Sequence, residues 1–543
     1  MSCAAAIALP WSAPVGVRMA GLIRAMALVC ATLACVLSGA AAQDLRVGLS
    51  ADPGSLDPHY DNFSANNQIS LHIFEALVAQ DEHQLLRPSL ATSWRAIDER
   101  TWEFKLREGV RFHDGSPFTA DDVVFSLDRV AKVPNAPSPF THFTRQIAEV
   151  EVVDPLTIRL RAAGPAPLLP RDLSAIRILS RKAASGPAPE GRTTEQLNRG
   201  EGLVGTGPFR FVSWTRGRQL TLVRNEDYWG PRPAWVNVAF YPIADTTTRL
   251  AALDSGDLDF VENPPALELP RLRRDERWRV VTVASNRLIY LHLDHRGEPS
   301  PGIPDTAGKN PLKDRRVREA LNLALDRGEL VSRAMAGDAV IAADLLPWPM
   351  FGARQNAAAV TPNPDLARRL LAEAGYPDGF SLILGSPNGR YVNDVRVAEA
   401  VAARWTAIGV KTRVEASQPQ AFFQNRDAHR YSAYLAGWST AAGEAGDPLR
   451  ALIATPDRER GLGGTNRGRY SNPEVDALLI EALRTIDDDR RRALLADASR
   501  LALEDVALLP LYFEMAGWLM RRGLTYLGRT DQFTLAAFIT PVP

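Results

Sequence analysis

One stretch sets the pattern for the chain: residues 101–126 read TWEFKLREGVRFHDGSPFTADDVVFS. Its first six residues alternate polar and apolar side chains, which is typical of a strand with one buried face. Residues 113–116, His-Asp-Gly-Ser, favour a tight turn. Thr119 can then cap a helix, and the Asp122 carboxylate falls near the positive end of that helix. The stretch therefore predicts a strand, a turn and a helix in that order.

Strands and helices keep alternating in the second half of the chain. Residues 380–384 predict a strand, residues 393–408 a helix capped by Asn393, and residues 410–414 a second strand. This β-loop-α-β order favours a parallel sheet, and with it an α/β fold. Before it, residues 314–336 predict one long helix, because apolar side chains recur there at four-residue spacing.

The N-terminus has the features of a secretory signal peptide. Arg18 and Arg24 precede an apolar run, residues 25–37, and small residues follow up to Ala42. The run is shorter than the roughly 20 residues that a membrane-spanning helix needs. We expect a signal peptide over residues 1–42 that is cleaved after Ala42, with a retained N-terminal anchor as the alternative. All three cysteines precede that position, so the mature chain has no thiol nucleophile or thiolate metal ligand.

Composition narrows the classes of function. The chain has 63 basic and 63 acidic residues, and loss of the signal peptide removes two arginines. Without an excess of positive charge, binding to nucleic acid is not expected. No second long apolar run follows the signal peptide, so we expect a soluble mature protein. The mature chain is long enough for two or more domains.

A series of different short motifs, each present once, extends along nearly the whole mature chain. They lie at residues 88–94, 101–126, 205–209, 224–230, 251–259, 316–321 with 324–326, 372–380 and 470–476. In this order they resemble the family 5 extracellular solute-binding proteins of bacteria. That family includes dipeptide-, oligopeptide- and nickel-binding members.

The resemblance implies a two-lobed periplasmic-binding-protein fold with an extra subdomain in the first lobe. The first lobe would comprise residues 43–285, with the subdomain at about 63–202, and residues 513–543 would complete it. The second lobe would comprise residues 286–512. The two lobes would close on a ligand by hinge motion.

By the same resemblance, the chain would be the periplasmic solute-binding component of an ABC importer. It would act as a monomer with an inner-membrane permease and its ATPases. The ligand would be a short peptide or a peptide-like zwitterion. A metal chelate, haem, an opine or a sugar is the alternative ligand, and an exported hydrolase is the alternative function.

Neither enzymatic activity nor a cofactor is expected. The sequence lacks a Gly-x-Ser-x-Gly elbow, a phosphate loop with Gly-Lys-Ser/Thr, and a His-Glu-x-x-His helix. His292 and His295 stand three residues apart in a predicted strand, so they would point to opposite faces. We therefore expect no catalytic residues and no metal site.

Residues 386–394 form the first predicted ligand loop, after the strand 380–384. In an α/β lobe, loops at the carboxyl ends of strands face the cleft. Dipeptide-binding relatives carry an arginine in the matching loop that binds the ligand carboxylate, and Arg390 stands at that position. A guanidinium group suits this task because its planar fork pairs with both carboxylate oxygens. Tyr391 and Asn388 are expected to contact the ligand beside it.

Residues 437–448, GWSTAAGEAGDP, form the second predicted ligand loop. Peptide-binding relatives carry an aspartate shortly after Gly-Trp, and this aspartate holds the ligand ammonium group. Here the loop is longer and has no acid at that place, so Glu444 is the nearest substitute. We expect Glu444 to bind an ammonium group and Trp438 to form an aromatic wall of the cleft, with core packing as the alternative for Trp438. Asp447 is expected to cap or turn the loop.

Overall fold

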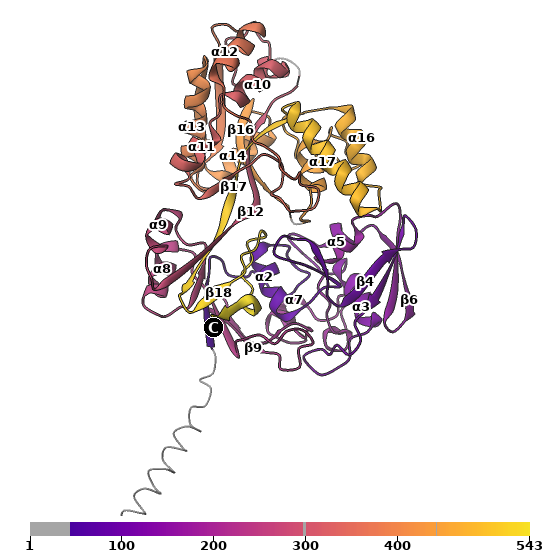
Figure 1. The fold of residues 1–543 in the computed structure, drawn as a ribbon. Coiled ribbons are helices and arrows are strands. Elements are labelled where there is room, and N and C mark those ends of the chain that lie inside the picture. Colours follow the sequence, from indigo (N-terminus) through magenta and orange to yellow (C-terminus); the bar gives the residue numbers. More distant parts are fainter. Residues whose placement is uncertain (1–43, 297–299, 441, 543) are drawn as a thin grey trace, which may run out of the picture. The chain divides into compact units, whose positions relative to one another are not determined.

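The computed structural model describes residues 44–296, 300–440 and 442–542, and the predicted signal peptide lies outside them. Its largest sheet has 11 strands. Two long strands, β12 (Trp278–Leu293) and β17 (Leu508–Arg521), pair antiparallel at its centre and can be followed in Figure 1. Beyond β12 lie β16 (Ala433–Ser439), β14 (Phe380–Pro387) and β15 (Val410–Ser417); beyond β17 lie β11 (Phe260–Glu262), β1 (Asp44–Leu49), β10 (Asn237–Pro242), β9 (Gln219–Arg224) and β8 (Phe209–Thr215); β13 (Ala339–Ile341) pairs with β17.

Buried hydrophobic side chains form two sets of cores. Two cores take their buried members only from residues 288–513, which we call the second lobe. Three others take theirs from residues 45–278 and 516–539, which we call the first lobe. The predicted α/β fold is confirmed. The exact lobe boundaries and the separate subdomain stay predictions.

Between the two sets of cores, β12 carries extra residues relative to β17. Ala284 is paired with Met515, and the next pair is Leu288 with Phe513. Residues 285–287 therefore form a bulge in β12. Bulges of this kind bend the strand and re-aim its side chains.

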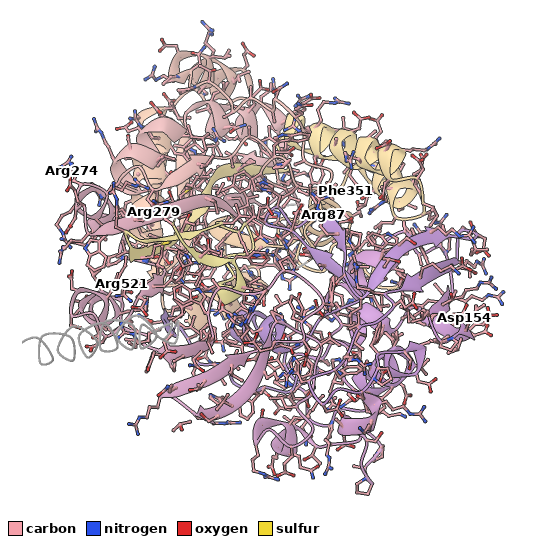
Figure 2. All side chains as sticks on the ribbon, turned by 60° about the horizontal axis from the view of Figure 1, so that its bottom comes forward. Arg87, Asp154, Arg274, Arg279, Phe351 and Arg521 are labelled. Carbon is pink, nitrogen blue, oxygen red and sulfur yellow. The ribbon has the colours of Figure 1, made fainter. Side chains whose placement is uncertain are left out.

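The stretch that predicted a strand, a turn and a helix folds in that order. β5 (Thr101–Leu106) leads through a turn to α3 (Ala120–Val130). In the turn, Gly115 has a φ of +80°, which glycine adopts without strain. At the helix start, the Asp122 carboxylate accepts the N–H of Thr119 at 2.9 Å, as a capping residue does. The strand belongs to a four-stranded sheet with β4 (Ala91–Ala96), β7 (Thr157–Ala162) and β6 (Ile147–Asp154), and the end of β6, Asp154, is labelled in Figure 2.

Two of the motifs meet at one buried carboxylate. Glu75 accepts hydrogen bonds from Thr206 Oγ1 at 2.8 Å, Tyr228 Oη at 2.9 Å and Trp229 Nε1 at 2.7 Å. Burial raises the pKa of Glu75 to about 7, against the effect of these donors. The motif residues Thr206, Tyr228 and Trp229 thus connect two motifs to Glu75 inside the first lobe.

A fully buried ion pair also stabilises the first lobe. Arg129 on α3 donates Nη1 and Nη2 to the two carboxylate oxygens of Asp57, at 2.8 and 2.7 Å, and neither side chain is exposed. Asp57 also accepts the Thr194 hydroxyl at 2.7 Å and the N–H of His59 at 3.0 Å. Burial alone would raise the pKa of Asp57, but the charge and hydrogen bonds of Arg129 place it below its usual value.

The remaining first-lobe elements are α2 (Ser64–Ile73), β2 (Val78–Gln80), β3 (Leu86–Pro88), α4 (Thr141–Thr144), α5 (Leu169–Leu173), α6 (Arg181–Ala184), α7 (Thr194–Asn198), α8 (Thr246–Asp254), η1 (Ala266–Glu268), α9 (Leu269–Leu272), β18 (Leu524–Tyr526), η5 (Ala536–Phe538) and β19 (Ile539–Pro541).

The second lobe contains the predicted β-loop-α-β unit. β14 and β15 pair in parallel and are connected through α13 (Asp394–Ala407). Asn393 stands at the N-cap position of this helix, as predicted, but its side chain makes no capping hydrogen bond. Asn393 has a φ of +55° and donates its side-chain amide to Ala334 O at 3.0 Å, so the side chain is turned to another segment.

The helix predicted over residues 314–336 is interrupted. Asp326 accepts the N–H of Glu329 at 2.9 Å and so starts a new turn. The buried Arg327 donates Nε to Pro510 O at 2.7 Å, which draws the chain toward β17. The segment consists of α10 (Arg315–Leu323), α11 (Arg327–Glu329) and the π-helical η3 (Leu330–Ala334).

Two asparagines predicted from the Asn-Pro pattern do cap helices. Asn363 accepts the N–H of Leu366 at 3.0 Å, and Asn472 accepts that of Glu474 at 3.0 Å. The helix that Asn472 caps, α16, packs beside the next helix, α17, as Figure 1 shows. The remaining second-lobe elements are η2 (Pro311–Lys313), α12 (Pro364–Glu373), α14 (Pro419–Asp427), α15 (Gly446–Pro448), η4 (Leu449–Ile453), α16 (Pro473–Ala482) and α17 (Asp488–Glu504).

Candidate functional site

The two predicted ligand loops lie at the same edge of the sheet. β14 and β16 are parallel neighbours, so the loops that follow them leave from the same end. Tyr391 Oη donates to Gly437 O at 3.3 Å. A side chain at Gly437 would begin only 2.7 Å from the Tyr391 ring. Residues 386–394 therefore pack against the start of the second loop, residues 437–448.

Arg390 stands on a loop that Asp394 holds in place. The Asp394 carboxylate accepts the backbone N–H groups of Gly389, Arg390 and Tyr391 at 3.1, 2.8 and 3.1 Å. The Arg390 side chain is exposed, and its guanidinium carbon lies 5.3 Å from the centre of the Tyr391 ring. Within the described residues, no carboxylate forms a salt bridge with it. One positive charge is thus displayed on a fixed loop.

The other two predicted residues of this loop differ in exposure. Asn388 is exposed, and its backbone N–H donates to Ser417 O at 2.8 Å, which fixes the loop to the end of β15. Tyr391 is only 8% exposed, because its ring packs against the second loop and the neighbouring core. Asn388 can present its amide to a ligand, whereas Tyr391 mainly joins the two loops.

Two charged residues beside this loop were not predicted. Nε of Arg287, in the β12 bulge, lies 3.4 Å from Oε2 of Glu514 on β17. Glu514 also accepts the N–H of Val392 at 3.2 Å. Burial raises the pKa of Glu514, while the charges of Arg287 and Arg390 lower it. No local pattern indicates the cluster, because the pairing of β12 with β17 creates it.

Trp438 is half-buried and packs against a second-lobe core, which was the alternative predicted for it. Its Nε1 donates to Asp447 Oδ2 at 3.2 Å. Burial raises the pKa of Asp447, whereas hydrogen bonds from Thr440 and Trp438 lower it. Asp447 therefore takes part in the internal hydrogen bonds of the second loop.

Glu444 is buried, with 1% of its side chain exposed, and it already has two cationic partners. Its Oε2 lies 2.6 Å from Nη1 of Arg491 and 3.4 Å from Nε of Arg171. A ligand ammonium group would have to displace a guanidinium group from this carboxylate. The arrangement thus differs from the expected ammonium anchor, because two arginines remote in sequence balance its charge.

The described part of the chain has no group of three or more His, Cys, Asp or Glu side chains placed to hold a metal ion. His292 and His295 take part in packing instead. Nδ1 of His292 lies 2.7 Å from Tyr434 Oη, and Nε2 of His295 lies 3.1 Å from Ala507 O. Burial lowers the pKa of His292 to about 3.

None of the described helices is long and apolar enough to cross a membrane. Two surface hollows, of about 400 and 230 Å³, lie away from the predicted ligand loops. The first is lined by charged side chains of the four-stranded sheet, including Arg159, and the second by α11, η3 and α13. Neither is lined by a residue of the two loops.

Comparison with known proteins places the chain among binding proteins. Residues 86–457 match the family described as bacterial extracellular solute-binding proteins, family 5 Middle. The glutathione-binding protein GsiB of Escherichia coli K12 is 28% identical over 505 residues, covering 92% of this chain and 94% of GsiB. GsiB of Salmonella typhimurium is also 28% identical, over 481 residues, covering 87% and 90%.

Solved structures share the fold. The murein tripeptide binding protein MppA, in its unliganded open form, matches with a TM-score of 0.79 and 24% identity over 92% of this chain and 98% of MppA. HbpA2 of Haemophilus parasuis gives 0.78 and 23%, covering 92% and 100%. DppA of Helicobacter pylori, in complex with the peptide STSA, gives 0.68 and 24%, covering 92% and 98%. Since the family match covers well over half of the sequence, the chain belongs to the bacterial extracellular solute-binding proteins of family 5.

Proposed function

We propose that this chain captures a short peptide or peptide-like molecule in the periplasm and delivers it to an ABC importer. Membership of the solute-binding family supports the binding role. Arg390 supports the ligand class, because its exposed guanidinium is held on a rigid loop with no salt bridge from the described residues. A guanidinium group in this setting suits a ligand carboxylate, which it can bind through two hydrogen bonds.

The named ligands of relatives support the same class. GsiB is named for glutathione, MppA for a murein tripeptide, and the DppA structure contains a peptide. Linear peptides and glutathione carry at least one free carboxylate. A ligand of this kind would meet Arg390 first, with Asn388 and the half-buried ring of Trp438 beside it.

Arg287 adds a second cation to the proposed site. Its side chain is 24% exposed and forms a salt bridge with Glu514, whose pKa the charge of Arg390 also lowers. The carboxylates of Glu514 and Asp394 lie beside these two guanidinium groups, so the four formal charges balance before a ligand binds. Glu444 is assigned to the ion pairs of the protein and not to the ligand.

A ligand panel tests this proposal by isothermal titration calorimetry. Glutathione and an unmodified dipeptide are expected to bind, and the amidated form of the dipeptide is expected to bind at least about tenfold more weakly, because its carboxylate is gone. Haem, a nickel–histidine chelate and a neutral sugar serve as comparisons. Equal affinity for the amidated dipeptide, or tight binding of the sugar or haem alone, would contradict the proposed ligand class.

Closure of the two lobes is the second expected property. The bulge at residues 285–287 lies where β12 passes between the two sets of cores, which suits a bending point. Small-angle X-ray scattering should show a smaller radius of gyration when the tightest-binding panel ligand is saturating. An unchanged radius of gyration at saturation would contradict hinge closure.

A further inference from the structure

Arg171 reaches from the first lobe into the second predicted ligand loop. It lies on α5, which packs into a first-lobe core, and its side chain is 3% exposed. Its Nη1 donates to the carbonyl oxygens of Ala442 at 2.6 Å and Gly443 at 3.5 Å. Its Nε lies 3.4 Å from Oε2 of Glu444. One buried guanidinium group thus contacts three consecutive residues of the loop.

Glu444 is anchored separately within its own lobe. Arg491 on α17 donates Nη1 to Glu444 Oε2 at 2.6 Å and Nη2 to Asp488 at 3.0 Å. The Phe351 ring, labelled in Figure 2, lies 4.3 Å from the Arg491 guanidinium and 5.6 Å from that of Arg171. The loop therefore has a fixed attachment to the second lobe without Arg171. What Arg171 adds is a connection between the lobes.

The surface around Arg171 closely fits the loop. Gly443 has a φ of +69°, and an added Cβ would lie 2.7 Å from the Cβ of Gln84 in the first lobe. Only glycine permits this approach. Asn286, in the β12 bulge, donates its amide to Gln84 Oε1 at 2.6 Å and to Thr440 O at 2.8 Å. The same loop is thus held to the first lobe at two points.

A third contact lies between α16 and α17. Ile486 is partly buried against the first-lobe core that also contains α5. The loop that contacts Arg171 and the segment just before α17, the helix that carries Arg491, therefore approach the same part of the first lobe. The association of the two lobes here combines apolar packing with a buried ion pair.

We propose that Arg171 is a positioning residue that holds the second ligand loop against the first lobe. Lobe association then receives a contribution from the protein itself, in addition to the contribution of a ligand. The apparent affinity for a ligand that contacts this loop is then proportional to the fraction of molecules in which the loop is in place. The inference rests on the proposed function in one respect, namely that the second ligand loop faces the ligand.

The test uses the mature full-length protein without added ligand. In Arg171→Met, backbone amides of residues 442–446 should exchange hydrogen about 10- to 100-fold faster, as expected for the loss of a charge-assisted hydrogen bond. The radius of gyration in solution should increase, because the lobes associate less. The thermal midpoint should change little, since Glu444 keeps Arg491. Arg171→Lys should restore part of both effects.

Arg491→Met is the matched control, because it removes the other arginine from the same carboxylate. It should lower the thermal midpoint of the second lobe while Arg171 keeps the loop near the first lobe. Gly443→Ala blocks the close approach to Gln84 and should open the protein as Arg171→Met does. Wild-type exchange rates and radius of gyration in both Arg171→Met and Gly443→Ala would overturn the inference. A ligand panel without binders would leave this result intact.

Discussion

Replacing Arg390 with alanine is expected to weaken binding of the tightest-binding panel ligand by roughly 2–5 kcal/mol. Much of this loss comes from the ligand carboxylate, which would be left without a partner in a closed site. Arg390→Lys should recover only part of the affinity, because an ammonium group cannot form the two-pronged contact. Calorimetric titration of the three proteins measures these differences directly.

Arg396 provides a matched control on the same side of the second lobe. It is exposed on α13, which begins just after the loop that carries Arg390. Arg396→Ala removes the same charge and should leave the affinity unchanged. If Arg390→Ala binds as tightly as the Arg396→Ala protein does, the ligand carboxylate is bound elsewhere, and the proposed ligand class loses its main support.

Replacing Arg129 with methionine is expected to lower the free energy of unfolding by about 3–5 kcal/mol. The substitution leaves the buried Asp57 carboxylate with only the Thr194 hydroxyl and the N–H of His59. An uncompensated charge at a fully buried position is costly, whereas the intact pair is satisfied by two short hydrogen bonds. Urea unfolding at pH 7, followed by tryptophan fluorescence, measures the change.

The pH dependence of this effect has a definite sign. In the wild type the folded pKa of Asp57 is below its usual value, so its contribution is present above about pH 4 and is lost as the pH falls through the folded pKa. Without Arg129, burial raises the pKa of Asp57, and the variant should regain relative stability as the pH falls from 7 toward 4. If the unfolding free energies of the wild type and Arg129→Met differ by the same amount at pH 7 and pH 4, Asp57 is not the group that Arg129 keeps ionised.

An exposed ion pair nearby is the control for this substitution. Arg181 and Asp121 are 3.1 Å apart, and their side chains are 58% and 63% exposed. Exposed pairs of this kind contribute little, because water and salt screen them and the side chains lose rotamer freedom. Arg181→Ala should therefore unfold at nearly the same urea concentration as the wild type.

Local signals predicted the second lobe well where the stabilising contacts are also local. Asn363 and Asn472 cap their helices through residues within three positions, and the β14–α13–β15 unit follows its hydrophobic pattern. The prediction of a single helix over residues 314–336 was wrong, because Arg327 donates a hydrogen bond to Pro510 O, far along the chain. A periodic apolar pattern carries no information about such a contact.

The candidate site shows the same division. Arg390 could be placed from its loop, and the hydrogen bonds of Asp394 that support it are local. The ion pairs of Glu444 could not be predicted, because Arg171 and Arg491 come from two different helices remote in sequence. An acid that looks available in the sequence is therefore already paired with two arginines in the fold. The pairing of Arg287 with Glu514 is hidden for the same reason.

The paired strands β12 and β17 also limit how the protein can move. They remain hydrogen-bonded on both sides of the bulge, from Trp278 with Arg521 to His292 with Leu508. A ribbon of this kind has few conformations to lose, so the proposed closure would not require the ordering of a flexible linker. If the lobes close on a ligand as proposed, rotation of one lobe must therefore be taken up as a twist or bend of this hydrogen-bonded ribbon.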